Sequence, residues 1–177
     1  MSNPSWPVLD SRVEYETGWY DGGYDLLEQP DGSTKRYYWA ELPPAVVVVA
    51  IDGDSVLFVE QYRPTVRRYC LELPAGIVED GESYEAAGKR ELEEETGYRS
   101  EQVDLLETFD VATGVLRHER GIVLARDLVA GEVNRDENEF LAVKRIDRSE
   151  AIDRVREGEA NDAALEGLLL AARDGYL

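Results

Sequence analysis

Three glutamates near the middle of the chain combine a residue type and a spacing that suit cation binding. Glu91 and Glu95 lie four residues apart, and Glu91 and Glu94 three apart, so a helix would carry all three carboxylates on one face. Mg²⁺ prefers oxygen ligands and typically takes one or two carboxylates together with water and substrate phosphate. Arg90 can pair with Glu94 or reach back to Glu82. A Glu-rich helix can equally be a solvated face, so the cluster alone leaves its role open.

The segment that carries these glutamates is expected to be a helix over residues 83–96. Ser83 is a suitable N-cap, and Gly97 suits the left-handed position that ends a helix. Strands are expected on both sides of it, at residues 34–41, 45–51, 55–61, 69–73, 102–109, 119–126 and 139–146. Two amphipathic helices are expected at 149–157 and 160–173, and an acidic loop at 130–138. This pattern predicts an α/β (α+β) fold, with a mixed sheet and helices packed outside it.

Two segments of this pattern have a more specific interpretation. Residues 45–51 are continuously apolar, which predicts a strand buried on both faces. The turn signal Pro30-Asp31-Gly32 precedes the alternating residues 34–41, whereas residues 11–28 are extended but poorly patterned. Together they predict an antiparallel hairpin near the N-terminus.

Composition and charge exclude several classes of function. The 177 residues suit one domain, with an ordinary apolar fraction of 43%. A net charge of −19 argues against nucleic acids and anionic membrane surfaces as partners, because both attract clustered Lys and Arg. Cys70 is the single cysteine, which leaves no disulfide framework and no cysteine-based zinc site. No signal pattern and no apolar run near the roughly 20 residues of a membrane helix is found, so a soluble, cytoplasmic protein is expected.

The charge balance is itself unusual. Only three lysines (Lys35, Lys89 and Lys144) stand beside sixteen arginines, and 38 Asp and Glu residues outnumber both. This surplus of carboxylates resembles that of proteins from salt-loving organisms, in which high salt screens the self-repulsion. An acidic enzyme from an ordinary environment is the alternative.

Residues 76–98 read GIVEDGESYEAAGKRELEEETGY and resemble the Nudix box. That motif is a glycine, five residues, Glu, seven residues, then Arg-Glu-aliphatic-x-Glu-Glu-x-Gly-aliphatic. Eight positions are in register: Gly76, Glu82, Arg90, Glu91, Leu92, Glu94, Glu95 and Gly97. Tyr98 departs from the motif, since an aliphatic residue is usual there, and this affects packing rather than chemistry. The match is too extensive to be accidental, and it favours a metal-binding helix over a solvated face.

The resemblance extends to the ADP-ribose pyrophosphatase branch of that family and covers roughly residues 15–172. It is carried by Glu60-Gln61-Tyr62-Arg63-Pro64, by Leu71-Glu72-Leu73-Pro74-Ala75-Gly76, by the N-terminal segment and by residues 158–163. The resemblance implies a Nudix α/β/α sandwich over residues 44–177. It also implies an N-terminal β segment, residues 1–43, that serves in dimerisation and as a substrate lid, and hence a homodimer.

The same resemblance implies a set of metal and catalytic residues. Glu91, Glu95 and Glu94 would bind Mg²⁺, which Mn²⁺ can replace, together with the backbone carbonyl of Ala75, and Glu94 and Arg90 count with the catalytic residues. A later acidic loop supplies a further carboxylate, which here is Glu137 or Glu139. We favour Glu139 as a metal ligand and Glu137 as general base, the alternative being that both are solvated loop acids. Mg²⁺ would reverse the local charge and let an anionic diphosphate approach.

Substrate contacts are expected from residues outside the box. Arg63 would grip a phosphate or ribose oxygen from a loop beside the site, with a surface salt bridge as the alternative, and Glu72 is expected to contribute to substrate binding. Trp19, Tyr37 and Trp39 are candidates for stacking on adenine. Tyr37 and Trp39 lie two apart on a strand and would share one face. Core or dimer packing is the alternative role for these aromatic residues.

The expected reaction is the Mg²⁺-dependent hydrolysis of ADP-ribose or a similar nucleoside diphosphate sugar to a nucleoside monophosphate and a sugar phosphate. One departure bears on the substrate: ADP-ribose enzymes usually carry a proline sixteen residues beyond the last box glycine, and Thr113 stands there. Another nucleoside diphosphate derivative or a nucleoside triphosphate is therefore the nearest alternative substrate. A sensor that binds a nucleotide without cutting it is a further alternative, but such modules usually lose box glutamates and this chain has them all.

Overall fold

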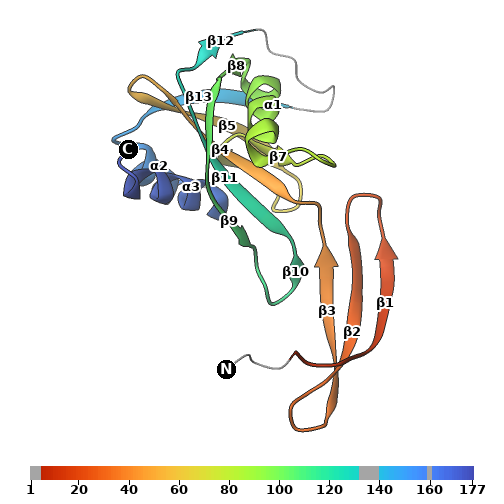
Figure 1. Ribbon diagram of the computed structural model, residues 1–177. Helices are drawn as coiled ribbons and strands as arrows, with labels where there is room; N and C mark the ends of the chain where they lie inside the picture. The colour runs from red at the N-terminus through yellow and green to blue at the C-terminus, as the bar shows by residue number, and fades with distance from the viewer. Residues whose placement is uncertain (1–4, 132–139, 159–160) are drawn as a thin grey trace. The chain divides into compact units, whose positions relative to one another are not determined.

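The structure is a computed structural model that describes residues 5–131, 140–158 and 161–177. The chain divides into two compact units (Figure 1). The small unit comprises Met1–Pro44 and Asp110–Glu119, and the large unit comprises Ala45–Phe109 and Arg120–Leu177. The strands that belong wholly to the small unit are β1 (Val8–Glu16), β2 (Asp21–Glu28), β3 (Thr34–Glu41) and β10 (Leu116–Arg117).

The remaining elements are those of the large unit, with β9 and β11 each extending one residue beyond it. The strands are β4 (Ala45–Asp52), β5 (Ser55–Arg63), β6 (Arg68–Glu72), β7 (Ala75–Ile77), β8 (Tyr98–Arg99), β9 (Gln102–Asp110), β11 (Glu119–Arg126), β12 (Val129–Ala130) and β13 (Leu141–Asp147). The helices are α1 (Tyr84–Thr96), α2 (Ala151–Glu157) and α3 (Asp162–Arg173).

The small unit is a sheet in the order β1-β2-β3-β10, with β10 parallel to β3 and the other pairs antiparallel. The predicted hairpin is present as β2 and β3, but the poorly patterned segment before it forms a further strand, β1. The break between β1 and β2 is a turn in which Thr17 Oγ1 accepts hydrogen bonds from the backbone N–H groups of Trp19 and Tyr20. Gly18 takes a left-handed conformation there, with φ of 76°, which glycine adopts without strain.

The large unit is built on a mixed sheet in the order β13-β5-β4-β11-β9, with β6 added to β5 and β7 added to β4. β4 and β11 run parallel, whereas β4 is antiparallel to β5 and β7. The predicted mixed α/β fold is therefore confirmed. The short strands β7, β8, β10 and β12 were not predicted from the sequence.

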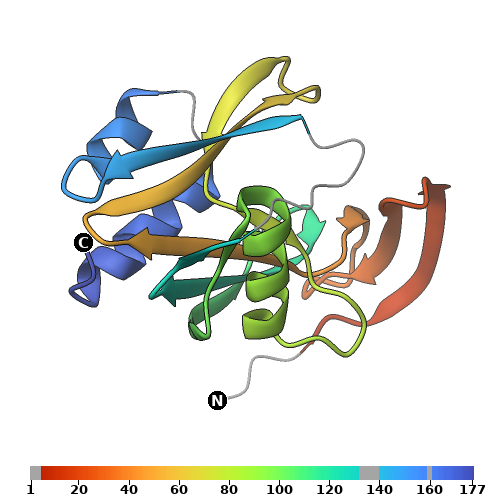
Figure 2. The same ribbon diagram turned by 90° about the horizontal axis from the view of Figure 1, so that it is seen from above.

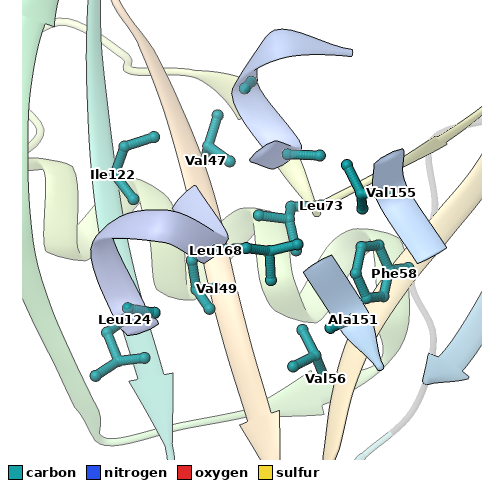
Figure 3. Close-up of a cluster of buried hydrophobic side chains, with 13 residues drawn as sticks. Val47, Val49, Val56, Phe58, Leu73, Ile122, Leu124, Ala151, Val155 and Leu168 are labelled. Carbon is teal, nitrogen blue, oxygen red and sulfur yellow. The ribbon is translucent and has the colours of Figure 1, made fainter. Parts of the chain in front are cut away.

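Helices cover both faces of this sheet (Figure 2). On one face, Val46 and Val48 of β4 pack with Leu92 of α1. On the other face, Val47 and Val49 pack with residues of α2 and α3 such as Leu168 (Figure 3). β4 is thus buried on both sides, as its continuous apolar run predicts. Each fully buried aliphatic side chain contributes roughly 1.5–3 kcal/mol through removal from water.

The ends of α1 follow the sequence signals. Ser83 Oγ accepts a hydrogen bond from Ala86 N at 3.2 Å, and the N–H of Gly97 donates to Glu93 O at 2.8 Å. Gly97 has a φ of 75°, the left-handed geometry common just after a helix. α3 begins slightly later than expected because Asn161 caps it through Ala164 N. Within the residues that the structure describes, no helix has both the length and the apolar character needed to span a membrane.

Candidate functional site

Two of the three clustered glutamates point from α1 toward the backbone of β7. Glu91 is 7% exposed and Glu95 is 4% exposed. The backbone N–H of Ala75 donates to Glu95 Oε2 at 3.1 Å. A Cβ atom placed on Gly76 would lie 1.9 Å from Glu91 Oε1. The helix face and β7 therefore form a cradle in which both carboxylates are held against main chain.

Arg90 links three carboxylates, those of Glu82, Glu91 and Glu94. Its Nη1 donates to Glu91 at 2.7 Å and to Glu94 at 3.1 Å, and its Nε and Nη2 both donate to Glu82. Nη2 also donates to Ile77 O at 2.7 Å. The expected pairings of Arg90 with Glu94 and with Glu82 are both confirmed. The hydrogen bond that Arg90 donates to Glu82 raises the pKa of Arg90, and so do the hydrogen bond to Glu91 and the negative charge of Glu91. Together they outweigh burial, which alone would lower that pKa.

Glu82 precedes α1 and is fixed from two sides. It accepts the two hydrogen bonds from Arg90 and a third from Glu79 N at 3.1 Å. The Arg90 hydrogen bond, aided by Glu79 N–H, lowers the pKa of Glu82 despite partial burial. Glu82 therefore remains ionised around neutral pH and anchors the arginine that orients Glu91 and Glu94.

Arg63 makes a second ion pair on the sheet beside α1. It is the last residue of β5, not a loop residue as expected, and its Nε donates to both carboxylate oxygens of Glu72 at 3.0 Å. Glu72 is only 3% exposed, and Gln61 Nε2 donates to it at 2.9 Å. Burial opposes the charge on Arg63, but the hydrogen bond to Glu72 and the charges of Glu72 and Glu95 outweigh it and raise the Arg63 pKa. Glu72 is an internal partner of Arg63 here.

The oxygen donors on α1, together with Glu82 just before it, suit a hard divalent cation. Glu82, Glu91, Glu94 and Glu95 bring four carboxylates, whereas Arg90 brings one guanidinium, which leaves an excess of negative charge in a partly buried place. Oxygen donors of this kind are what Mg²⁺ and Mn²⁺ take. Within residues 5–131, 140–158 and 161–177, however, no three His, Cys, Asp or Glu side chains converge as a ready-made metal cluster. Arg90 accounts for part of this lack of convergence, because the carboxylates of Glu91 and Glu94 both accept hydrogen bonds from it.

The other residues expected to bind metal or activate water do not belong to α1. Ala75 lies in β7 opposite Val47 of β4, and the metal role of its carbonyl stays a prediction. Glu137 and Glu139, expected as general base and metal ligand, lie outside the described residues.

The expected adenine-stacking residues lie in the small unit. Trp19 is 67% exposed beside the Thr17 turn. Tyr37 and Trp39 share one face of β3, opposite Asp25 and Gly23 of β2. Tyr37 packs edge-on against Trp6, with ring centroids 5.9 Å apart.

Trp39 is already contacted by a cation that was not predicted from the sequence. The guanidinium carbon of Arg117 lies 3.9 Å from the centroid of the Trp39 ring, a distance typical of a cation–π contact. Asp25 accepts from both Trp39 Nε1 and Arg117 Nη2, so the three side chains form one network. No local pattern could reveal this contact, because it depends on β10 returning to pair with β3.

Thr113, which stands where a proline is usual, also lies in the small unit. It lines a pocket of about 510 Å³ together with Glu41, Leu42, Pro44, Asp110 and His118 among others. Thr113 is therefore part of a hollow surface of the small unit.

Comparisons with known proteins agree with this geometry. A model of the NUDIX domain matches residues 41–165. An "ADP-ribose pyrophosphatase" of Bacillus subtilis (strain 168) is 34% identical over 140 residues, which is 77% of this chain and 76% of that protein. A "Methanol dehydrogenase activator" of Bacillus methanolicus is 34% identical over 142 residues, 78% and 77% of the two chains. A solved structure described as "Crystal structure of ADP compounds hydrolase" superposes with a TM-score of 0.89 over 100% of both chains at 24% identity, which shows a shared fold.

Proposed function

Because this chain belongs to the NUDIX domain family, we propose that it hydrolyses the diphosphate bond of ADP-ribose or a similar nucleoside diphosphate sugar. The products are a nucleoside monophosphate and a sugar phosphate. The chain is thus a pyrophosphatase, as its relatives of that activity support. The observation that carries the proposal is the arrangement on α1, where buried Glu91 and Glu95 lie against β7 and Arg90 gathers Glu82, Glu91 and Glu94.

The reaction requires a divalent cation, and we propose Mg²⁺, with Mn²⁺ able to replace it. Glu91, Glu95 and Glu94 would hold the metal, with the carbonyl of Ala75. When bound, the cation supplies positive charge against the diphosphate and Lewis acidity toward phosphorus. Its necessity follows from charge, because two like charges about 4 Å apart repel by on the order of 4 kcal/mol at an effective dielectric of 20.

Other residues of the chain orient the metal-binding carboxylates and bind the substrate. Arg90 sets the direction of Glu91 and Glu94, and Ala75 N–H sets that of Glu95. Arg63 contacts a phosphate oxygen of the substrate with the part of its guanidinium that Glu72 leaves open. Glu137 takes the proton from the attacking water and Glu139 adds a metal ligand. Those last two roles are proposed from the resemblance alone.

The small unit is proposed to recognise the nucleoside and to form the dimer. Trp19, Tyr37 and Trp39 contact the adenine base. Residues 1–43 form a dimerisation and lid segment, and residues 44–177 form the hydrolase domain. Support comes from the exposed apolar side chains of β1, among them Val8, Leu9 and Val13, each more than half exposed. The proposed substrates are intracellular nucleotides, so a cytoplasmic location follows from the proposal.

Product analysis across a panel of substrates tests this function. Purified enzyme with Mg²⁺ is incubated with ADP-ribose, other nucleoside diphosphate sugars and nucleoside triphosphates, and the products are resolved by anion exchange. AMP and ribose 5-phosphate in equal amounts from ADP-ribose are expected. Because Thr113 stands where a proline is usual, a different nucleoside diphosphate derivative or a nucleoside triphosphate is the alternative substrate, which the same panel would reveal. Nucleotide binding without turnover of any compound would make the chain a sensor and refute the proposal.

A further inference from the structure

Strands β5 and β6 place three polar side chains on the sheet face that α1 covers. The register pairs Val59 with Glu72, Gln61 with Cys70 and Arg63 with Arg68. Side chains alternate along a strand, so Gln61, Arg63 and Glu72 share the face of fully buried Val59. Glu72 is 3% exposed and accepts hydrogen bonds from both Gln61 and Arg63. A buried carboxylate needs such partners, because an unpaired buried charge is strongly destabilising.

The two members of this ion pair differ in exposure. The side chain of Glu72 is 4% exposed, whereas that of Arg63 is 42% exposed. Glu72 engages Nε and Nη2 of the guanidinium, and within the described part of the chain Nη1 donates no hydrogen bond. The pair therefore has a fixed, buried end and an open end that carries free N–H donors.

Arg63 lies on the sheet face that α1 covers, because it alternates in register with Leu57, which packs with Leu92 of α1. The charge of Glu95 in α1 accordingly contributes to the raised pKa of Arg63. Only two residues separate Glu72 from Ala75 along the chain. The backbone N–H of Ala75 donates a hydrogen bond to Glu95.

We infer that Glu72 is a positioning residue, which fixes Arg63 so that its free Nη1 donors meet a phosphate oxygen of the diphosphate substrate while Glu72 itself touches no substrate. This inference rests on the proposed function and differs from the expectation that Glu72 binds substrate. Half-exposed arginines usually occupy many rotamers, and ordering one on binding lowers affinity by roughly tenfold. Hydrogen bonds donated by Nε and Nη2 to the buried carboxylate of Glu72 fix the guanidinium plane before the substrate arrives.

The test is a double-mutant cycle on substrate binding and turnover. Glu72→Gln keeps the size of the side chain but removes its charge. Arg63→Gln keeps an N–H donor that can reach Glu72, so the buried carboxylate still has a hydrogen-bond partner. Each variant and the double variant are assayed with the best substrate of the panel and by calorimetry with its α,β-methylene analogue. Melting temperatures are recorded alongside.

Glu72→Gln is expected to raise KM and the Kd of the analogue about tenfold, with a smaller change in kcat. In the Arg63→Gln background it should cause no further loss, because its effect passes through Arg63. Glu72→Asp, which retains the charge, should restore part of the affinity. As a matched control, Glu166→Gln breaks the 2.8 Å ion pair with Arg120 elsewhere in the large unit and should lower the melting temperature without changing KM.

Each contrary result has a separate meaning. Additive losses in the double variant would show that Glu72 contacts substrate or metal itself and would overturn the inference. A lowered melting temperature with unchanged KM and Kd would give Glu72 a purely structural role and overturn it equally. Both results leave the proposed function intact, whereas a wild-type enzyme that cleaves nothing in the panel overturns the function and the inference together.

Discussion

The carboxylate of Glu91 fills the space that a side chain at Gly76 would need. A Cβ on Gly76 would meet both carboxylate oxygens of Glu91 and its Cδ at 1.9–2.3 Å. Gly76 cannot withdraw, because β7 pairs with β4 and places it opposite Val46. The glycine at the start of the box is therefore required to let the glutamate on the helix lie flat against the main chain.

Replacing Gly76 by alanine should displace Glu91 and impair metal binding. We expect Gly76→Ala to reduce kcat/KM by at least about tenfold with only a small change in the melting temperature, because the atoms in the way are the carboxylate end of the flexible Glu91 side chain. Steady-state kinetics and thermal melts measure both effects. Gly114→Ala is the matched control, because a Cβ there meets nothing within 4 Å. Wild-type activity in Gly76→Ala would show that Glu91 need not lie in the cradle.

Removing the charge of Glu95 should stop turnover without unfolding the protein. Glu95→Gln keeps an oxygen that can accept from Ala75 N–H, so the local fold is retained. Loss of one charged group at the reacting diphosphate is expected to lower kcat by at least about a hundredfold. Calorimetric titration with Mg²⁺ should show weaker binding, and the circular dichroism spectrum should be unchanged. Near-normal kcat would remove Glu95 from the ligand set.

The ion pair between Glu82 and Arg90 should make stability depend on acid pH. Arg90 lowers the pKa of Glu82 in the folded state, so its stabilisation is fully present above the unfolded pKa of 4.5. It is lost as pH falls through the folded value. Glu82→Gln should therefore be less stable than wild type by about 1 kcal/mol at pH 7, and the difference should shrink at about pH 3.5.

Urea denaturation at the two pH values measures this difference directly. Glu101→Gln serves as the control, because Glu101 is fully exposed in its pair with Lys89 and such pairs contribute little. A gap between wild type and Glu82→Gln that is equally large at both pH values would contradict the assignment.

The geometry of α1 was predictable because its information is local. The spacing of Glu91, Glu94 and Glu95 fixes a helical face, and Ser83 and Gly97 fix the ends of the helix. The pairing of Arg90 with Glu94, four residues further along the helix, follows from the same periodicity. Local signals therefore sufficed for the helix, its ends and its central arginine.

Contacts between strands were not predictable in the same way. Arg63 meets Glu72 only because β6 folds back on β5, and Arg117 reaches Trp39 only because β10 pairs with β3. Strands as short as β7 and β10 carry too few residues to show a period of two. Their existence depends on the register with distant strands, which no local pattern encodes.

Truncating Trp39 tests the proposed contact with adenine. Base stacking contributes about 1–3 kcal/mol, so Trp39→Ala should raise KM for adenine substrates roughly tenfold or more. Tyr38→Ala is a suitable control, since Tyr38 is 58% exposed on the opposite face of β3. The comparison uses ADP-ribose and a uridine diphosphate sugar. An unchanged KM for ADP-ribose in Trp39→Ala would assign Trp39 to the network with Arg117 and Asp25 alone.

The acidic composition leads to a prediction about salt. At a net charge of −19, repulsion between surface carboxylates opposes the compact state, and salt shortens its range from about 10 Å at 0.1 M to about 3 Å at 1 M. If the composition is an adaptation to salt, the melting temperature should rise steeply between about 0.1 M and molar potassium chloride. Sulfate strengthens apolar burial as well as screening charge, so chloride isolates the electrostatic part. Sucrose at matched osmolality controls for the general exclusion of solutes from the protein surface. A melting temperature that does not change with potassium chloride concentration would show that the ion pairs of the fold already accommodate the charges.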